Sequence, residues 1–132
     1  MLYKAILDTG FTYYQNGSVL AGAGVSPHGS FKLRFNTIAR SALDASGELP
    51  AGNTFPTGSI IVKELTDGNS INLYAVIKKE PTNKYAGSGW LWAELETNGT
   101  VRTSAANKGD GGCINCHSEI PNRDLVRTFD FH

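Results

Sequence analysis

Three stretches in the middle of the chain are rich in apolar, β-branched and aromatic residues, and turn-forming residues separate them. They predict β-strands at residues 59–66, 71–79 and 89–96. An Asp-Gly-Asn turn connects the first two strands, and the looser segment 81–88 connects the last two. Because short turns join antiparallel neighbours, the pattern predicts an antiparallel meander.

The first predicted strand has the pattern of a strand at the centre of a sheet. Successive side chains of a strand point to opposite faces. Each face of residues 60–65 is apolar except for one charge, Lys63 on one face and Glu64 on the other. In the third strand, Trp90 and Trp92 share a face. Two apolar faces indicate that the first strand is covered on both sides.

Helix and turn signals surround this region. Residues 37–46 have helical spacing of apolar residues, with Asn36 as a possible N-cap and Gly47 at the C′ position. An Asn-Gly pair within residues 13–20 predicts a hairpin, and residues 31–35 form either a short strand or the approach to the helix. The chain as a whole predicts an α+β fold, an antiparallel sheet with a few packing helices.

Composition narrows the class of protein. A length of 132 residues suits a single domain over residues 1–132 with a modest core. Twelve basic and twelve acidic residues give no formal net charge, so nothing points to nucleic acid or an anionic membrane as a partner. No apolar run approaches the length of a membrane span.

The strongest chemical pattern lies near the C-terminus, where residues 113–117 read Cys-Ile-Asn-Cys-His. Two cysteines separated by two residues and followed by histidine are the attachment signature of c-type haem. Cys113 and Cys116 can each add to one vinyl group of the porphyrin, and His117 can then serve as the axial ligand of the iron. The pattern predicts one covalently bound haem.

Other uses of the two cysteines fit less well. A structural zinc site needs four Cys or His ligands, and this cluster offers three. A thioredoxin-like pair requires a strand-to-helix junction, whereas residues 104–112 form a polar, glycine-rich stretch. Since haem is normally attached outside the cytoplasm, we expect a periplasmic or otherwise exported protein. Residues 1–10 have no apolar core of a secretory signal, which indicates a mature form.

The second axial position of the iron is the informative feature. Met1 is the only methionine, so the His/Met ligation typical of electron-transfer cytochromes c is nearly excluded. Three possibilities stay open: a five-coordinate iron, a second histidine from His28 or His132, or an unusual ligand such as lysine. We favour the open site, and an open site binds or transforms small molecules.

Several segments, in this order, resemble the cytochrome P-460 family, which includes the cytochromes c′-beta. They are residues 55–65 (FPTGSIIVKEL), 73–78 (LYAVIK), 89–92 (GWLW), 113–118 (CINCHS) and 124–129 (DLVRTF). The resemblance spans about residues 55–131. It implies an antiparallel sheet with packed helices, a five-coordinate haem and a homodimer. Some members of the family oxidise hydroxylamine, and the c′-beta members bind nitric oxide or carbon monoxide in an apolar distal pocket.

The resemblance also implies roles for individual residues. Lys63 falls where the lysine that is cross-linked to the porphyrin lies in the hydroxylamine oxidases, and Arg34 matches a distal-pocket arginine. Tyr74 stands where some catalytic members carry an acidic residue, so a proton acceptor would be missing or replaced. The plainer alternatives are a solvated strand lysine beside Glu64 and a surface arginine. Phe31, Phe35 and Phe55 are candidates for a distal wall or for plain core.

Two classes of function follow. In the first, an open haem iron binds or acts on hydroxylamine, nitric oxide or carbon monoxide, as a possible oxidoreductase that exchanges electrons with a partner protein. In the second, a second histidine closes the iron and the protein is a six-coordinate electron-transfer cytochrome.

Overall fold

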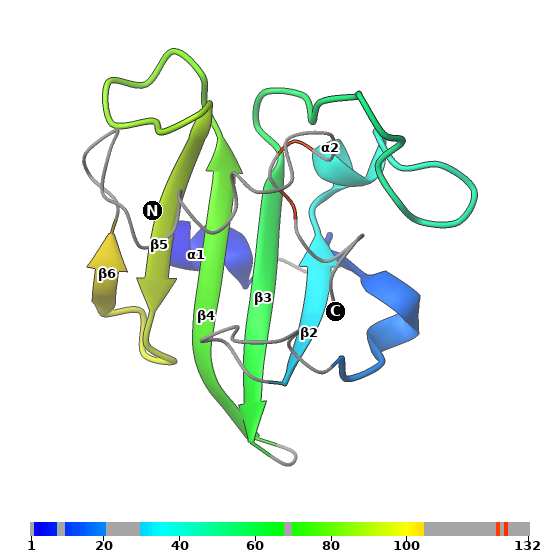
Figure 1. Ribbon diagram of the computed structural model, residues 1–132. Helices are drawn as coiled ribbons and strands as arrows, with labels where there is room; N and C mark the ends of the chain where they lie inside the picture. The colour runs from blue at the N-terminus through cyan, green and yellow to red at the C-terminus, as the bar shows by residue number, and fades with distance from the viewer. Residues whose placement is uncertain are drawn as a thin grey trace.

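The computed structural model describes residues 2–7, 10–20, 30–67, 70–104, 124 and 126. In these ranges the chain forms a six-stranded sheet whose strands lie in sequence order, and each pair of neighbours is antiparallel (Figure 1). The strands are β1 (Thr12–Tyr13), β2 (Phe31–Phe35), β3 (Ile60–Asp67), β4 (Ser70–Lys79), β5 (Trp90–Leu95) and β6 (Val101–Ser104). The predicted antiparallel meander is confirmed.

The three strands predicted from the sequence are β3, β4 and β5. The central position expected for β3 is also confirmed, because it pairs with β2 on one side and with β4 on the other. Residues 31–35 are strand β2, which resolves the choice between a strand and a run into the helix.

The helices are short: α1 (Leu2–Ile6), α2 (Thr37–Arg40) and the 3₁₀ turn η1 (Tyr14–Gly17). The helix predicted for residues 37–46 begins where expected, but the observed helix α2 is shorter and ends at Arg40. The side chain of Asp44 accepts hydrogen bonds from the main-chain N–H groups of Ser46 (2.9 Å) and Glu48 (3.2 Å). A local turn of this kind competes with the helix for the same main-chain groups. None of the helices in the described ranges is long and apolar enough to cross a membrane.

The predicted hairpin within residues 13–20 is wrong in its pairing. Tyr13 pairs with Arg34 of β2, and Leu20 forms a bridge to Phe31 of the same strand. The two sides of the turn therefore both add to β2 instead of pairing with each other. The turn itself is left-handed, with positive φ at Gln15 and Asn16 as well as at Gly17.

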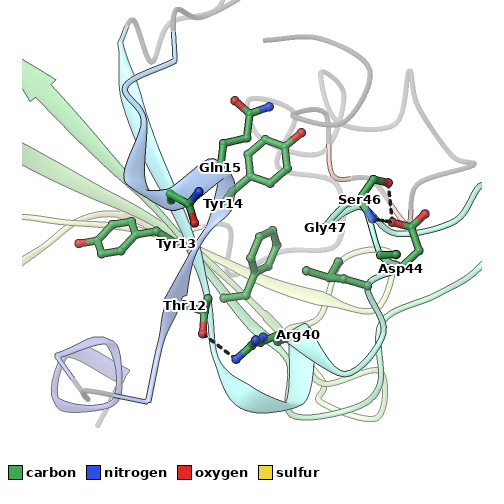
Figure 2. A pocket seen from close by; sticks show the side chains of 12 residues that line it. Thr12, Tyr13, Tyr14, Gln15, Arg40, Asp44, Ser46 and Gly47 are labelled. Carbon is green, nitrogen blue, oxygen red and sulfur yellow. Dashed lines mark hydrogen bonds between the residues drawn. The ribbon is translucent and has the colours of Figure 1, made fainter.

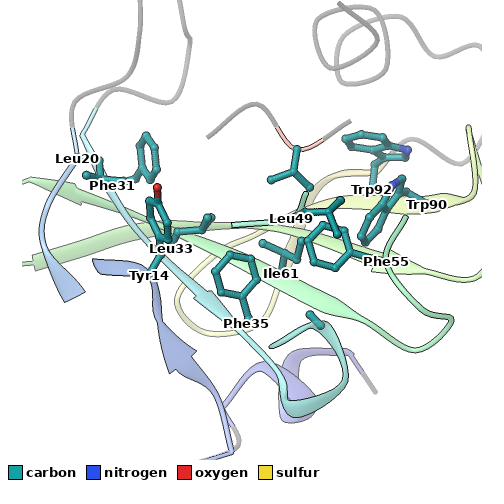
Figure 3. Packing of buried hydrophobic residues seen from close by; sticks show 12 residues of the cluster. Tyr14, Leu20, Phe31, Leu33, Phe35, Leu49, Phe55, Ile61, Trp90 and Trp92 are labelled. Carbon is teal, nitrogen blue, oxygen red and sulfur yellow. The ribbon is translucent and has the colours of Figure 1, made fainter. Parts of the chain in front are cut away.

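The alternation of side chains divides the residues of the sheet between two faces with separate cores. One face, called here the Lys63 face, carries an apolar and aromatic cluster that is seen along one side of the sheet in Figure 3. Its buried members from the strands are Phe31, Leu33, Phe35, Ile61, Trp90 and Trp92. The opposite face, called the Arg34 face, carries Ile60, Val62, Tyr74, Val76 and Leu95.

Helix α1 covers the Arg34 face. Its last residue, Ile6, is fully buried and belongs to the cluster of that face. In Figure 1 the helix lies behind the sheet, across from β4 and β5. The Arg34 face thus has a cover supplied by the N-terminal part of the chain.

Asn36 connects α2 to the start of β3, and its substitution tests how much this connection stabilises the fold. Its side-chain oxygen accepts hydrogen bonds from Ala39 N (2.9 Å) and Ile60 N (3.0 Å), and its amide nitrogen donates to Gly58 O (3.0 Å). We expect Asn36→Ala to lower the free energy of unfolding by about 2–3 kcal/mol in urea titrations, because three part-buried groups lose their partners. Asn36→Asp, which keeps the acceptor, should cost less. Equal stability of wild type and Asn36→Ala would contradict this role.

Candidate functional site

The predicted haem ligands Cys113, Cys116 and His117 lie outside the described residues, as do His28 and His132. The site is therefore built from the residues of the sheet and from two described residues that follow the haem motif in sequence. These are Asp124 and Val126, and both are buried.

Asp124 is held on the Lys63 face by three separate elements. Its carboxylate accepts hydrogen bonds from Nζ of Lys79, at 2.7 Å to each oxygen, and from the main-chain N–H of Phe55 at 2.8 Å. Its main-chain carbonyl accepts a hydrogen bond from Nε1 of Trp90 at 2.9 Å. Val126 belongs to the apolar cluster of the same face. The chain that follows the haem motif is thus anchored on the Lys63 face.

This anchor limits where the haem motif can lie. Asp124 comes seven positions after His117. Seven residues span at most about 25 Å when fully extended. The described part of the chain beyond the haem motif thus contacts the Lys63 face, whereas the Arg34 face carries α1.

Lys63 lies on the same face as this anchor. It is half-buried, and its Nζ lies 4.1 Å from the centre of the Phe31 ring, a cation–π contact. Its cross-strand neighbours are Leu33 on β2 and Ala75 on β4. The ammonium group of Lys63 therefore lies beside an aromatic ring on a partly covered face of the sheet.

Glu94 is a candidate that the sequence analysis did not select. Ala75 pairs with Lys63 on one side and with Glu94 on the other, so the lysine and the glutamate lie in one row of the Lys63 face with a small residue between them. Glu94 is half-buried. The two-residue alternation that links Trp90 and Trp92 to Glu94 was visible in the sequence, but its relation to Lys63 depends on the register of three strands.

Arg34 lies on the opposite face and is fully engaged there. Its side chain is buried, its Nε donates to Oε2 of Glu64 at 2.8 Å, and a second nitrogen donates to the main-chain oxygen of Ile6. Its guanidinium also lies 4.8 Å from the centre of the Phe11 ring. These contacts join the N-terminal segment to the sheet. Because the side chain is buried, the interpretation of Arg34 as a surface arginine is wrong.

Tyr74 shares the Arg34 face and lies directly across from Glu64. Burial, followed by the nearby Glu64 carboxylate, raises the pKa of Tyr74 above its ordinary value. Burial and the hydrogen bond to Glu64 likewise raise the pKa of Tyr13, whose hydroxyl donates to that carboxylate at 2.9 Å. A phenol with a raised pKa stays protonated at neutral pH, so Tyr74 does not supply a proton acceptor.

The structure thus separates the three residues that the resemblance grouped together. Lys63 points to one side of the sheet, while Arg34 and Tyr74 point to the other. The aromatic residues proposed for a distal wall do lie with Lys63. Phe35 and Phe55 stack at 6.4 Å between ring centres, and Phe55 meets the edge of Trp90 at 5.7 Å.

A cavity of about 490 Å³ lies between η1 and the turn after α2 (Figure 2). Phe35 and Leu43 contribute apolar surface to it, and Arg40 reaches across it to Thr12 at 3.4 Å. Lys63, Arg34 and Tyr74 do not line this cavity. The cavity shares Phe35 with the aromatic wall of the Lys63 face.

The described residues fit a porphyrin on chemical grounds. Apolar and aromatic side chains suit the surroundings of a porphyrin ring, and the buried cluster of the Lys63 face has such side chains on β2, β3 and β5. The two thiols and the imidazole of residues 113–117 are the groups that attach and ligate a c-type haem. Asp124 and Val126, which follow that motif in sequence, contact the same face of the sheet.

Comparison with known proteins agrees with this chemistry. The family model of cytochrome P460 matches residues 14–128, which is most of the chain. A search of curated proteins finds no significant match. The family implies a haem cofactor and a c-type cytochrome. From the arrangement of the sheet and the extent of this match, the chain belongs to the cytochrome P460 family.

Proposed function

We propose that this protein is a mono-haem c-type cytochrome with an open, five-coordinate iron that binds or acts on small nitrogen-oxide ligands. Cys113 and Cys116 would hold the haem, and His117 would be its proximal ligand. The observation that supports this proposal most strongly is that Lys63 and the anchored residue Asp124 share one face of the sheet.

A bound haem would supply an iron centre that takes up a small ligand and exchanges electrons. The protein's own contribution comes from the Lys63 face. Phe31, Leu33 and Ile61 exclude water from the region beside Lys63, because all three are buried there. The ammonium group of Lys63 favours an anionic ligand, since opposite charges attract strongly where water is excluded.

Glu94 would take the role that the sequence analysis sought at Tyr74. As a carboxylate in the same row as Lys63, it can accept a proton from a ligand such as hydroxylamine. Arg34 would act through the fold instead, by neutralising Glu64 beneath α1. Lys63 and Glu94 would thus provide a positive and a negative group in one row of the Lys63 face, which suits proton-coupled chemistry as well as gas binding.

The cellular location and the partners that we propose depend on the haem. Covalent attachment supports an exported, periplasmic location, and electrons removed from a ligand would pass to a redox partner protein. The family resemblance supports a homodimer. Carbon monoxide, nitric oxide and hydroxylamine are the ligands to test.

The spectrum of the reduced protein tests whether the iron is open. We expect a high-spin ferrous spectrum that changes on addition of carbon monoxide, because no internal methionine is available as a sixth ligand. A low-spin spectrum that carbon monoxide leaves unchanged would instead support a second histidine and an electron-transfer function. Replacing His28 and His132 by alanine in turn would then identify that ligand.

Azide binding to the ferric protein tests the charges beside the iron. Lys63→Met should weaken azide binding about tenfold, and Glu94→Gln should strengthen it, because the two substitutions remove opposite charges. Lys32→Met is the matched control, since Lys32 pairs with Glu64 on the other face of the sheet. If Lys32→Met changes the affinity as much as Lys63→Met does, the assignment of the faces is wrong. Peptide mapping of wild type by mass spectrometry shows in addition whether Lys63 is linked to the porphyrin.

Arg34→Met separates a structural role from a distal one. We expect it to lower the free energy of unfolding by about 3–5 kcal/mol, because Glu64 is left as a buried charge. Azide affinity and the carbon monoxide spectrum of the folded fraction should stay as in wild type. A large change in azide affinity with little loss of stability would return Arg34 to the distal pocket.

A further inference from the structure

The ion pair between Lys79 and Asp124 is buried. The exposed fraction of the side chain is 10% for Lys79 and 8% for Asp124. Lys79 Nζ also lies 5.0 Å from the centre of the Trp90 ring. A buried pair of this kind adds little net stability, because desolvation of both charges offsets their attraction. Such a pair can instead favour a single arrangement of the two chain segments that carry the charges.

The residues around the pair keep Lys79 and Asp124 in place. Lys79 of β4 donates to both carboxylate oxygens of Asp124, and Phe55 N in the loop before β3 donates to one of them. Trp90 of β5 donates to the main-chain carbonyl of Asp124. Gly89 leaves room for the lysine, since a Cβ at that position would lie 3.2 Å from Lys79 Nζ. Gly89 also has a φ of +86°, which favours glycine.

One of these contacts reaches the aromatic residues of the candidate site. The main-chain N–H of Phe55 donates to Asp124, and the Phe55 ring packs against both Phe35 and Trp90. The same carboxylate therefore connects the chain that follows the haem motif with the aromatic wall of the Lys63 face. A shift of Asp124 would move both.

We propose that Lys79 and Asp124 are positioning residues that fix the haem-bearing C-terminal segment against the aromatic wall of the Lys63 face, and thereby set a single ligand geometry at the iron. This inference rests on the proposed function. It assigns no catalytic step to either residue, since both act through the segment and through Phe55. The haem remains attached through its cysteines when the pair is broken, but its environment becomes heterogeneous.

The test uses the holoprotein with Lys79→Met, Asp124→Asn and Lys79→Arg. Lys78→Met is the matched control, because Lys78 is the adjacent residue on β4 and forms a more exposed ion pair with Glu80 at 2.5 Å. Three quantities are measured: hydrogen exchange along the chain, the ferric electron paramagnetic resonance spectrum and the kinetics of carbon monoxide binding. Asp124→Asn keeps the carbonyl that accepts from Trp90, so it retains part of the anchor if Lys79→Met does not fold.

For Lys79→Met and Asp124→Asn we expect exchange in the segment after His117 to accelerate about a hundredfold while β3 keeps its protection. The single ferric species should split into several, and carbon monoxide binding should become multiphasic. Lys79→Arg should restore most of the wild-type behaviour, and Lys78→Met should match wild type.

Two outcomes would overturn the inference. One is a uniform loss of protection over the whole chain with unchanged spectrum and ligand kinetics, which would mean that the pair only stabilises the fold. The other is wild-type behaviour of both Lys79→Met and Asp124→Asn. Failure of wild type itself to bind carbon monoxide is a different result, because it rejects the open-site function, while the exchange and resonance measurements still decide the role of the pair.

Discussion

The pleat of the central strand β3 is the constraint on which the rest of the structure depends. Lys63 and Glu64 are adjacent, so their side chains must leave the sheet on opposite faces. Because β3 has a neighbour on each side and a core on each face, neither charge reaches bulk water easily. Each must therefore find a partner within its own face. For Glu64 the partners are Arg34 and Tyr13, whereas Lys63 lies over the ring of Phe31.

This division separates a structural side of the molecule from a chemical side. On the Arg34 face, Arg34 binds both Glu64 and the main-chain carbonyl of Ile6, and α1 covers this region. On the Lys63 face, Lys63 and Glu94 stay half-buried in one row, beside buried aromatic residues. These half-buried charges, together with the anchor at Asp124, are the reason for proposing ligand chemistry on the Lys63 face.

Much of the fold was predictable because it depends on local patterns. The β-branched runs and turns gave the meander and the central place of β3. The start of α2 was predictable from Asn36 as its N-cap. Its end was not, because the side chain of Asp44 forms hydrogen bonds that stabilise a turn, and the spacing of apolar residues does not reveal that turn. The predicted hairpin failed for a similar reason, because an Asn-Gly pair predicts a turn without saying which strand its flanks will join.

The candidate site was less predictable, since it depends on register and on distant contacts. The haem motif could be identified from five consecutive residues, and the face of Lys63 from its own strand. Arg34 and Lys63 could not be assigned to opposite faces without the pairing of Leu33 with Lys63, which places Arg34 one residue out of phase. Glu94 required the register of β3, β4 and β5 together. Asp124 is 45 residues from Lys79 in sequence, and no local pattern marks that contact.

The central claim is that the haem lies on the Lys63 face, and paramagnetic relaxation of methyl groups tests it most directly. The iron of the ferric protein accelerates the relaxation of nearby protons in a steeply distance-dependent way. We expect strong relaxation of the methyl groups of Leu33, Ile61 and Ile77, and weak relaxation of those of Val62 and Val76 on the opposite face. Stronger relaxation at Val62 and Val76 would place the haem on the Arg34 face and contradict the account.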